Sequence, residues 1–308
     1  QRQMCIRDRS NTTHKSVPML LSPVSAQNFD SIYYRKSVIT AFKEAGFQTA
    51  FFSNQRYNHS FIDFFGMEAD TYDFIKEDSQ DSQYNPSDDE LLMLVEKELE
   101  KGNRKQFIVL HTYGSHFNYR ERYPETAAFF LPDFPVDAEV KYKDNLMNAY
   151  DNSIRYTDNF LARIIHLLKQ QQVDASMLYT SDHGEDIFDD GRHLFLHASP
   201  VPSYYQLHVP LLLWTSDSYR EEYPGIEKAA SMNRQKNISS SISFFQTMME
   251  LAGIETPYRN DSLSVTSPLY TEKSRVYLND HNEPRPLDDI GMRKEDFEML
   301  KKRGIDAQ

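Results

Sequence analysis

Short apolar runs alternate with helical patterns along most of the chain. Buried strands are predicted at residues 47–53, 106–111, 175–180, 208–214 and 275–278. Amphipathic helices are predicted between them at residues 31–45, 88–101, 143–171 and 238–251. This alternation predicts an α/β fold with a mostly parallel central sheet flanked by helices on both faces. In such a sheet, ligands bind beyond the carboxyl ends of the strands.

Polar residues follow three of these predicted strands at the point where each strand ends. They are Ser53-Asn54-Gln55, the segment from His111 to His116, and Ser181-Asp182-His183. Because the carboxyl ends of parallel strands meet at one edge of a sheet, these side chains are expected to converge. The sequence therefore predicts a functional site at this edge.

Charge and hydropathy exclude two classes of protein. The net charge is −12, whereas nonspecific nucleic-acid binding depends on Lys and Arg that neutralise phosphates. The longest clearly apolar run, residues 209–214, is far shorter than the roughly 20 residues of a membrane-spanning helix. We therefore expect no nucleic-acid partner, and we expect this chain by itself to be soluble.

The two ends of the chain differ from its middle. Residues 1–9 show no periodicity and fit nothing downstream, so we predict that they are a non-native leader. The only cysteine, Cys5, lies in this leader, which excludes a disulfide within the rest of the chain. Residues 10–290 are predicted to form the catalytic domain, and residues 291–308 are predicted to form a charged, peripheral C-terminal tail.

The strongest local motif is the triplet Asp182-His183-Gly184 at the end of a predicted strand. The carboxylate and the imidazole are both ligands for divalent metals. Gly184 allows a sharp turn and keeps a side chain out of the pocket. Taken alone, the triplet fits a strand-end turn with a capping aspartate equally well.

Further histidines favour the metal interpretation. His116 ends a polar segment just beyond a strand, His197 follows the triplet after a short loop, and His208 opens an apolar strand. A single histidine of this kind is more often a hydrogen-bonded structural residue. Several of them near strand ends are better explained by a metal centre.

The segment from Ser10 to Pro18 is rich in hydroxyl groups and precedes an apolar stretch. The N-terminus of a helix here would offer free N–H groups to an anion. A threonine at that position becomes a nucleophile when a metal lowers its pKa. The competing interpretation is a Ser/Thr helix cap, which is the more common role of such residues.

Together, these motifs resemble the catalytic domain of the lipid A phosphoethanolamine transferases, a sulfatase-like family of the alkaline phosphatase superfamily. The resemblance runs from about Ser10 to about His281, with its motifs in the same order. The matching stretches are residues 13–18 with Met19, Leu20 and Ser22, then 109–124, 148–158, 181–185, 196–197 and 208–214.

The resemblance implies a role for each matching residue. Thr13, four residues before Val17, falls on the family's nucleophile and also contacts the metal, and Asp182 and His183 fall on zinc ligands. His116 and His197 fall on the histidines that hold the donor phosphate or a second zinc. Further substrate contacts are expected from four residues: Asn54, Gln55, His59 and His208. The family's remaining zinc ligand, a glutamate, and its transmembrane helices would precede residue 10.

The implied reaction is transfer of phosphoethanolamine from phosphatidylethanolamine to lipid A or another glycan through a covalent threonine intermediate. The implied cofactor is one Zn²⁺ or two. The full-length protein would be a monomer at the periplasmic face of the inner membrane, attached through an N-terminal transmembrane region.

Three alternatives remain at the level of sequence. A glycerol-phosphate transferase of the lipoteichoic acid synthase type also uses a threonine nucleophile and a metal ion. A sulfatase would need a Cys/Ser-x-Pro-x-Arg motif, and the segment from Cys5 to Arg9 lacks the proline. A sulfatase-like hydrolase of phosphodiesters is a related alternative. An inactive binding domain is disfavoured because the nucleophile and the histidines occur together.

Overall fold

The computed structural model describes residues 2–7, 10–76, 85–102 and 105–303. These residues form two compact units. Unit 1 contains the described residues up to Ala45, residues 172–186 and the described residues from His197 onward. Unit 2 contains the described residues of 46–171 together with 187–196. Within this described part, each helix is either too short or too polar to cross a membrane.

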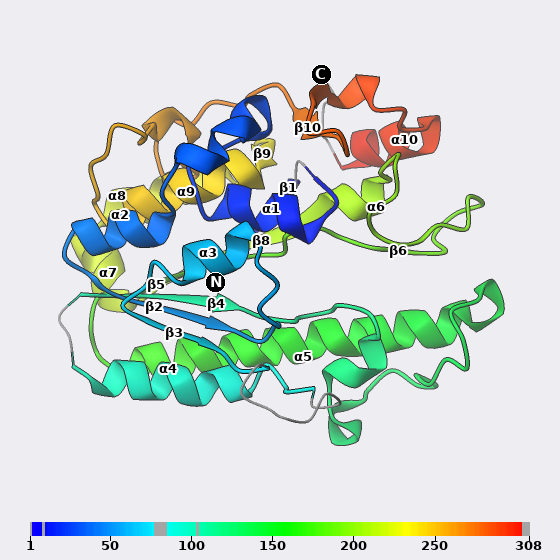
Figure 1. The fold of residues 1–308 in the computed structure, drawn as a ribbon, viewed down its shortest axis with the longest axis horizontal. Coiled ribbons are helices and arrows are strands. Elements are labelled where there is room, and N and C mark those ends of the chain that lie inside the picture. The colour runs from blue at the N-terminus through cyan, green and yellow to red at the C-terminus, as the bar shows by residue number, and fades with distance from the viewer. Residues whose placement is uncertain (1, 8–9, 77–84, 103–104, 304–308) are drawn as a thin grey trace. The chain divides into compact units, whose positions relative to one another are not determined.

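A four-stranded sheet lies at the centre of unit 1 (Figure 1). Its order is β5 (Ser176–Thr180), β8 (His208–Thr215), β1 (Arg2–Arg7) and β9 (Ile238–Ser239). Strand β8 runs antiparallel to both β5 and β1, and β9 runs parallel to β1. The apolar sequence of β8 explains its central place, because both faces of a central strand are covered.

The core of unit 1 forms where alternate residues of β8 meet the neighbouring helices. Val209, Leu211 and Leu213 point to one side of the strand and pack in one cluster with Ala230 and Leu251. Ala230 belongs to α8 (Pro224–Asn233) and Leu251 to α9 (Ser240–Leu251), which also packs against β5. Burying each of these larger side chains contributes about 1.5–3 kcal/mol.

The other elements of unit 1 are shorter. The helices are α1 (Thr13–Leu20), α2 (Val38–Glu44), α6 (Tyr204–Leu207), α7 (Asp217–Glu222) and α10 (Lys294–Lys302). The 3₁₀ helices are η1 (Ala26–Tyr34), η5 (Asp261–Leu263) and η6 (Leu287–Asp289), and β10 (Val276–Leu278) pairs with β11 (Pro284–Pro286). Helix α1 packs alongside α9, which positions its N-terminus within unit 1.

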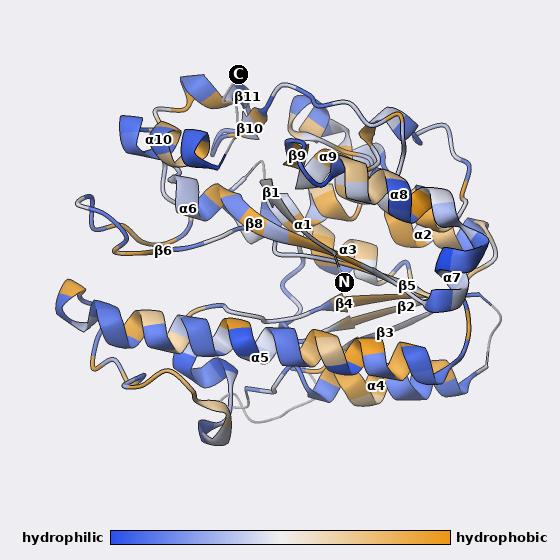
Figure 2. Cartoon of the chain, turned by 180° about the vertical axis from the view of Figure 1, so that it is seen from behind, coloured by the Kyte–Doolittle hydropathy of each residue, from blue (hydrophilic) through white to orange (hydrophobic). Residues whose placement is uncertain are grey.

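Unit 2 contains a three-stranded parallel sheet. Strand β2 (Gln48–Ser53) lies between β3 (Thr71–Phe74) and β4 (Gln106–His111). The register pairs Ser53 with Phe74 on one side and with His111 on the other. The two predicted polar strand ends, at residues 53 and 111, therefore do lie at the same edge. Figure 2 shows β4 in orange, in agreement with its run of apolar residues.

Helices cover both faces of this sheet (Figure 1). Helix α3 (Phe61–Gly66) lies so close to β2 that a Cβ atom on Gly66 would be 2.6 Å from the ring of Phe51. Helices α4 (Glu90–Glu100) and α5 (Lys143–Gln170) lie on the opposite face. The remaining elements are η2 (Tyr119–Arg122), η3 (Glu125–Ala127), η4 (Val140–Tyr142) and the paired strands β6 (Asp186–Ile187) and β7 (Phe195–Leu196).

The predicted α/β class is confirmed, and the strand directions are more mixed than the prediction of a mostly parallel sheet. The parallel pairs are β1–β9, β2–β3 and β2–β4, whereas β8 is antiparallel to its neighbours. The connection from β5 to β8 contains only the four-residue helix α6 and not a long helix. It therefore lacks the helical crossover that usually joins parallel strands.

Two local predictions were wrong. The single helix predicted at residues 31–45 is divided between η1 and α2, because the side chain of Ser37 caps a new helix by accepting a hydrogen bond from the backbone N–H of Ile39. The C-terminal tail is not peripheral throughout. Leu300 of α10 is buried in a cluster with Tyr204 and Leu207, since the segment carries apolar residues at helical spacing.

Residues 2–7 of the predicted leader form strand β1 of the sheet in unit 1. Residues 2–7 pair along their length with β8, so the expectation that they fit nothing downstream is wrong. Backbone N–H and C=O groups form a ladder with little regard to side-chain periodicity. The non-native origin of residues 1–9 and the domain limits at residues 10 and 290 stay predictions.

Candidate metal centre and nucleophile

Thr13 and His183 meet in unit 1 although they are 170 positions apart. The Oγ1 atom of Thr13 lies 3.0 Å from Nε2 of His183. Thr13 is the first residue of α1, after an extended Thr12 at the cap position whose side chain makes no capping hydrogen bond. The helix N-terminus therefore places a hydroxyl group, with the positive end of the helix dipole behind it, next to an imidazole.

The other ring nitrogen of His183 fixes its tautomer. Nδ1 of this ring lies 3.1 Å from the carbonyl oxygen of Gly184. A carbonyl oxygen only accepts hydrogen bonds, so Nδ1 carries the proton and Nε2 carries a lone pair. His183 is only 8% exposed, which shields this lone pair from bulk water. Nε2 is therefore ready to bind a cation beside the hydroxyl of Thr13.

Asp182 supplies a third donor atom at the same point. Its Oδ2 atom lies 3.5 Å from Nε2 of His183. Two ligands of a tetrahedral zinc, each about 2.0–2.2 Å from the metal, lie about 3.3 Å apart. The spacings of 3.0 Å and 3.5 Å around Nε2 of His183 bracket that value. The three predicted ligand atoms thus have a spacing that suits zinc.

A second carboxylate and a second imidazole adjoin this centre. Nδ1 of His197 lies 3.0 Å from Oε1 of Glu185, and the rings of His183 and His197 are 3.9 Å apart at their centroids. One ligand atom from each of His183, Glu185 and His197 falls within a 4.8 Å group that could hold a metal ion. The sequence analysis missed Glu185. Its signal was a carboxylate two positions after His183, on the same side of an extended segment.

Gly184 allows the motif to approach its neighbouring segment. A Cβ atom at this position would lie 2.1 Å from the carbonyl oxygen of Tyr205. The backbone N–H of Gly184 donates to the carbonyl oxygen of Gln206 at 2.8 Å. The glycine is therefore required for close backbone approach, which is a more specific reason than the sharp turn predicted from sequence.

Asn11 ties the loop before α1 to the rest of the centre. Its side chain is 0% exposed and accepts a hydrogen bond from the hydroxyl of Tyr277 at 2.7 Å. Its amide group donates to Oε1 of Gln206 and to the carbonyl oxygen of Ser199, at 2.7 Å and 2.9 Å. Gln206 in turn donates to the buried carboxylate of Asp186. This satisfied buried network holds the loop before Thr13 and the segment around Gln206, which contacts Gly184, in one arrangement.

The first turn of α1 also carries a cation. Nζ of Lys15 donates to the carbonyl oxygen of Asn279 at 2.7 Å. Burial lowers the pKa of Lys15, and the nearby carboxylate of Asp280 opposes that shift. Burial and the charge of Lys15 lower the pKa of His14. His14 is thereby favoured in its neutral form close to the proposed nucleophile.

His116 lies in unit 2, on the loop that follows β4. It is exposed, and the edge of its ring meets Tyr113 at a centroid distance of 5.1 Å. The loop is held from below by Asp88, whose carboxylate accepts from the backbone N–H groups of Tyr113 and Gly114, both at 2.8 Å. The role predicted for His116 at the donor phosphate stays a prediction.

The four predicted substrate contacts have different surroundings. Asn54 is 1% exposed and donates to Asp88 at 2.8 Å, so its burial favours a structural role in holding the loop of His116. Gln55 donates to a backbone carbonyl at 3.4 Å, and His59 is exposed beside an aromatic ring. His208 stacks on a tyrosine ring of α6. Substrate binding by these four residues stays a prediction.

Relatives with known names are similar to this chain in sequence. The chain is 36% identical to phosphoethanolamine transferase EptA of Escherichia coli (strain K12) over 157 residues, which are 49% of this chain and 28% of EptA. It is 28% identical to the putative transferase YhbX of the same strain over 288 residues, which are 92% of this chain and 47% of YhbX. The chain thus spans less than half the length of these relatives.

Solved structures and a family model agree with this relationship. The C-terminal periplasmic domain of EptC from Escherichia coli, solved as a complex with Zn, has a TM-score of 0.82. That match covers 94% of this chain and 83% of the EptC chain at 22% identity, so it shows a common fold. The family model described as Sulfatase matches residues 8–254. The chain therefore belongs to the sulfatase family, and it shares the fold of the EptC periplasmic domain.

Proposed function

We propose that this chain is the catalytic domain of a zinc-dependent phosphoethanolamine transferase acting on lipid A or another glycan. The observation that carries the proposal is the 3.0 Å approach of Thr13 Oγ1 to Nε2 of His183. The names of the relatives support the transferred group, and the Zn complex of EptC supports the metal.

Three side chains would hold the zinc: Thr13, Asp182 and His183. A bound zinc supplies positive charge that lowers the pKa of the threonine hydroxyl and stabilises phosphoryl oxygens. The residues themselves set the geometry. Proton placement on Nδ1 of His183 keeps its Nε2 aimed at Thr13, and the Asn11 network fixes the loop that carries the hydroxyl.

In the first half-reaction, Oγ1 of Thr13 attacks the phosphorus of phosphatidylethanolamine and releases its own proton to solvent. The bond from phosphorus to the diacylglycerol oxygen breaks, and that oxygen takes a proton from His197. Glu185 orients the ring of His197 for this step, since its carboxylate lies 3.0 Å from Nδ1. Phosphoethanolamine is then attached to Thr13 through a phosphodiester.

In the second half-reaction, an oxygen of the acceptor attacks the phosphorus, the bond to Thr13 breaks, and Oγ1 of Thr13 takes a proton from solvent. His197 recovers a proton from an acceptor hydroxyl or from solvent. We assign His116 to the donor phosphate, directly or through a second metal. Both lipid substrates lie in membranes, and the full-length protein is proposed to act as a monomer at the periplasmic face of the inner membrane.

A covalent adduct on Thr13 is the first expected result. The full-length protein, incubated with phosphatidylethanolamine and zinc without an acceptor, should carry phosphoethanolamine on the peptide that contains Thr13. Peptide mass spectrometry with fragmentation identifies both the residue and the group. Thr12→Ala is the matched control, because it removes the neighbouring hydroxyl and should keep the adduct.

Two outcomes would overturn this assignment. An adduct on Thr12 or Ser10 would show that another hydroxyl is the nucleophile. Cleavage of the lipid with no adduct on any residue would favour direct hydrolysis by water. A glycerol-phosphate adduct formed from phosphatidylglycerol, in preference to phosphoethanolamine, would instead support the lipoteichoic acid synthase type.

Zinc binding is the second expected result, and its measurement does not depend on activity. The chain should take up zinc in a titration followed by elemental analysis, and His183→Gln should weaken the affinity at least about 100-fold because a direct ligand is lost. The matched control is His166→Gln on α5, whose ring is exposed and hydrogen-bonded to Gln170. Equal zinc affinity in the two variants would contradict the proposed ligand set.

A further inference from the structure

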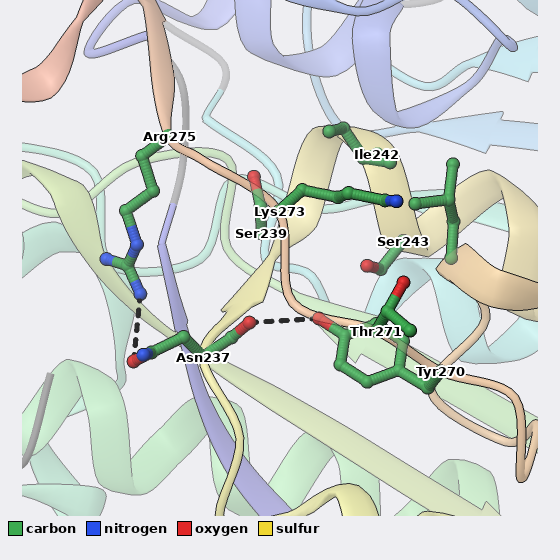
Figure 3. A pocket seen from close by; sticks show the side chains of 9 residues that line it. Asn237, Ser239, Ile242, Ser243, Tyr270, Thr271, Lys273 and Arg275 are labelled. Atoms are coloured by element: carbon green, nitrogen blue, oxygen red, sulfur yellow. Dashed lines mark hydrogen bonds between the residues drawn. The ribbon is translucent and has the colours of Figure 1, made fainter. Parts of the chain in front are cut away.

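A small polar hollow lies in unit 1 beside the N-terminus of α9 (Figure 3). One wall is the first turn of α9 with Ser239 and Ser243, and the other is the segment that carries Thr271, Lys273 and Arg275. Among the described residues that line it there is no carboxylate. The hollow combines hydroxyl groups with two cationic side chains, and none of these residues belongs to the centre around Thr13.

The first turn of α9 has hydrogen-bond donors without a side-chain cap. Ser239 occupies the cap position and its side chain makes no capping hydrogen bond. The backbone N–H groups of Ser241 and Ile242 donate to no acceptor within the described part of the chain. A helix N-terminus with free N–H groups favours an anion, but such an end alone does not make a site.

Ser243 supplies an independent observation. It is 3% exposed and lines the hollow, yet its hydroxyl has no hydrogen-bond partner among the described residues. Only its backbone carbonyl is used, as the acceptor for the hydroxyl of Thr247 at 2.7 Å. Buried hydroxyl groups are nearly always hydrogen-bonded. An oxygen atom of a ligand in the hollow would satisfy this one.

The charges around the hollow favour an anionic ligand. Figure 3 shows the exposed side chain of Lys273 reaching toward the first turn of α9, and no ion pair joins its ammonium to a described residue. Arg275 is held in place by a hydrogen bond from its Nη2 to Oδ1 of Asn237 at 3.2 Å. The opposing charge nearby is Glu272, which accepts from the amide group of Asn237 at 2.9 Å. Two cations thus face one carboxylate that is already hydrogen-bonded.

We infer that this hollow is a second anion site, which binds a phosphate group separately from the proposed catalytic centre. A tetrahedral phosphate has enough oxygens to accept from the N–H groups of Ser241 and Ile242, the hydroxyl of Ser243 and the ammonium of Lys273 at once. A carboxylate has two oxygens and would leave part of this donor set unused. The ligand is either inorganic phosphate or a phosphate monoester at the head of a lipid.

Backbone amide signals test the inference at the site itself. Titration of the isotope-labelled chain with inorganic phosphate, at ionic strength held constant with chloride, should shift the amide resonances of Ser241 and Ile242. Lys273→Gln should weaken this binding about tenfold, because a charge-assisted hydrogen bond is lost. The matched control is Lys228→Gln, an exposed lysine of α8, which should leave the affinity unchanged.

Two further variants separate this site from the catalytic centre and from general unfolding. Thr13→Ala should leave the shifts at α9 intact, so loss of the proposed function would not remove them. Ser243→Ala should preserve the overall spectrum and weaken phosphate binding about fivefold, in line with one neutral hydrogen bond. A parallel titration with short-chain phosphatidic acid, below its micelle concentration, distinguishes a lipid headgroup from free phosphate.

The inference fails if phosphate produces no shift at Ser241 and Ile242, or if chloride alone produces the same shift. It also fails if Lys273→Gln and Lys228→Gln bind phosphate equally well. Shifts with inorganic phosphate alone would identify free phosphate as the ligand, and shifts with both compounds would extend the site to phosphate monoesters on lipids.

Discussion

Thr13→Ala is expected to lower the rate of phosphoethanolamine transfer by roughly three to four orders of magnitude, equivalent to about 4–5 kcal/mol in the barrier. The variant removes the oxygen that would attack phosphorus, and among the described residues no other hydroxyl lies within hydrogen-bond distance of Nε2 of His183. The measurement is transfer from labelled phosphatidylethanolamine to lipid A by the full-length protein, with zinc content determined in the same samples.

The neighbouring hydroxyls provide the controls. Thr12→Ala should reduce the rate only modestly, because the hydroxyl of Thr12 faces Ser10 at 3.2 Å rather than the histidines. Thr13→Ser keeps the attacking oxygen and should restore most of the activity. A Thr13→Ala protein that retains zinc and transfers at the native rate would refute the assignment of the nucleophile.

Asn152→Ala should produce a large loss of stability, about 3–5 kcal/mol. Asn152 is 1% exposed, and its Oδ1 accepts from the backbone N–H groups of Phe129 and Phe130, both at 2.9 Å. Its amide group donates to the hydroxyl of Tyr123 at 3.2 Å and lies 3.4 Å from the buried carboxylate of Asp133. Alanine at this position would remove the hydrogen bonds of Asn152 to the two backbone N–H groups, to the tyrosine hydroxyl and to the carboxylate.

The free energy of unfolding in urea, measured for the native chain and the variant, tests this prediction. Asn148→Ala is the control, because Asn148 lies one turn earlier on α5 and makes one exposed hydrogen bond to the backbone of the same loop at 2.9 Å. Its loss should cost less than about 1 kcal/mol. Similar losses in the two variants would mean that the buried network contributes no more than a surface contact.

The same network explains why the loop at residues 129–134 is ordered despite its apolar surface. Phe129, Leu131 and Phe134 are each more than half exposed. Burial, and then the hydrogen bond to Asp133, raise the pKa of Tyr123 above its ordinary value, so this tyrosine stays a donor at neutral pH. Arg120 lies 3.3 Å from the carboxylate of Asp133 and balances its charge. The buried polar groups beneath the loop thus anchor it, in addition to the contacts that its exposed aromatic rings make with each other and with arginine side chains.

The hydrophobic periodicity of the sequence predicted the long helices and strands. It did not predict strand direction or helix breaks, which depend on contacts with other parts of the chain or on single capping residues. Residues 143–171 were predicted as a helix and α5 spans Lys143–Gln170, since a long amphipathic repeat carries its own signal. The antiparallel direction of β8 left no local signal, because direction depends on which strand lies beside it. The break between η1 and α2 depends on one capping serine within an otherwise helical pattern.

The candidate site was likewise predictable only where its residues lie in local sequence motifs. A strand-end motif and a hydroxyl-rich helix start were visible in the sequence, and the structure brings Thr13, Asp182, His183 and His197 together within unit 1. Glu185 was overlooked because a glutamate after a glycine is common on surfaces. The buried partners of Asn11 could not be predicted, since they come from three segments far along the chain.

The division of unit 1 into separate stretches of sequence has a consequence for biosynthesis. Unit 2 is mostly one continuous stretch, whereas the hydroxyl of Tyr277 that contacts Asn11 is 266 residues further along. At roughly 5–20 residues per second, translation delivers that partner tens of seconds after Asn11. During that interval, the nascent chain lacks one of the buried partners of Asn11. Ribosomes that stop before Tyr277 would release a chain whose nucleophile loop has lost a buried anchor.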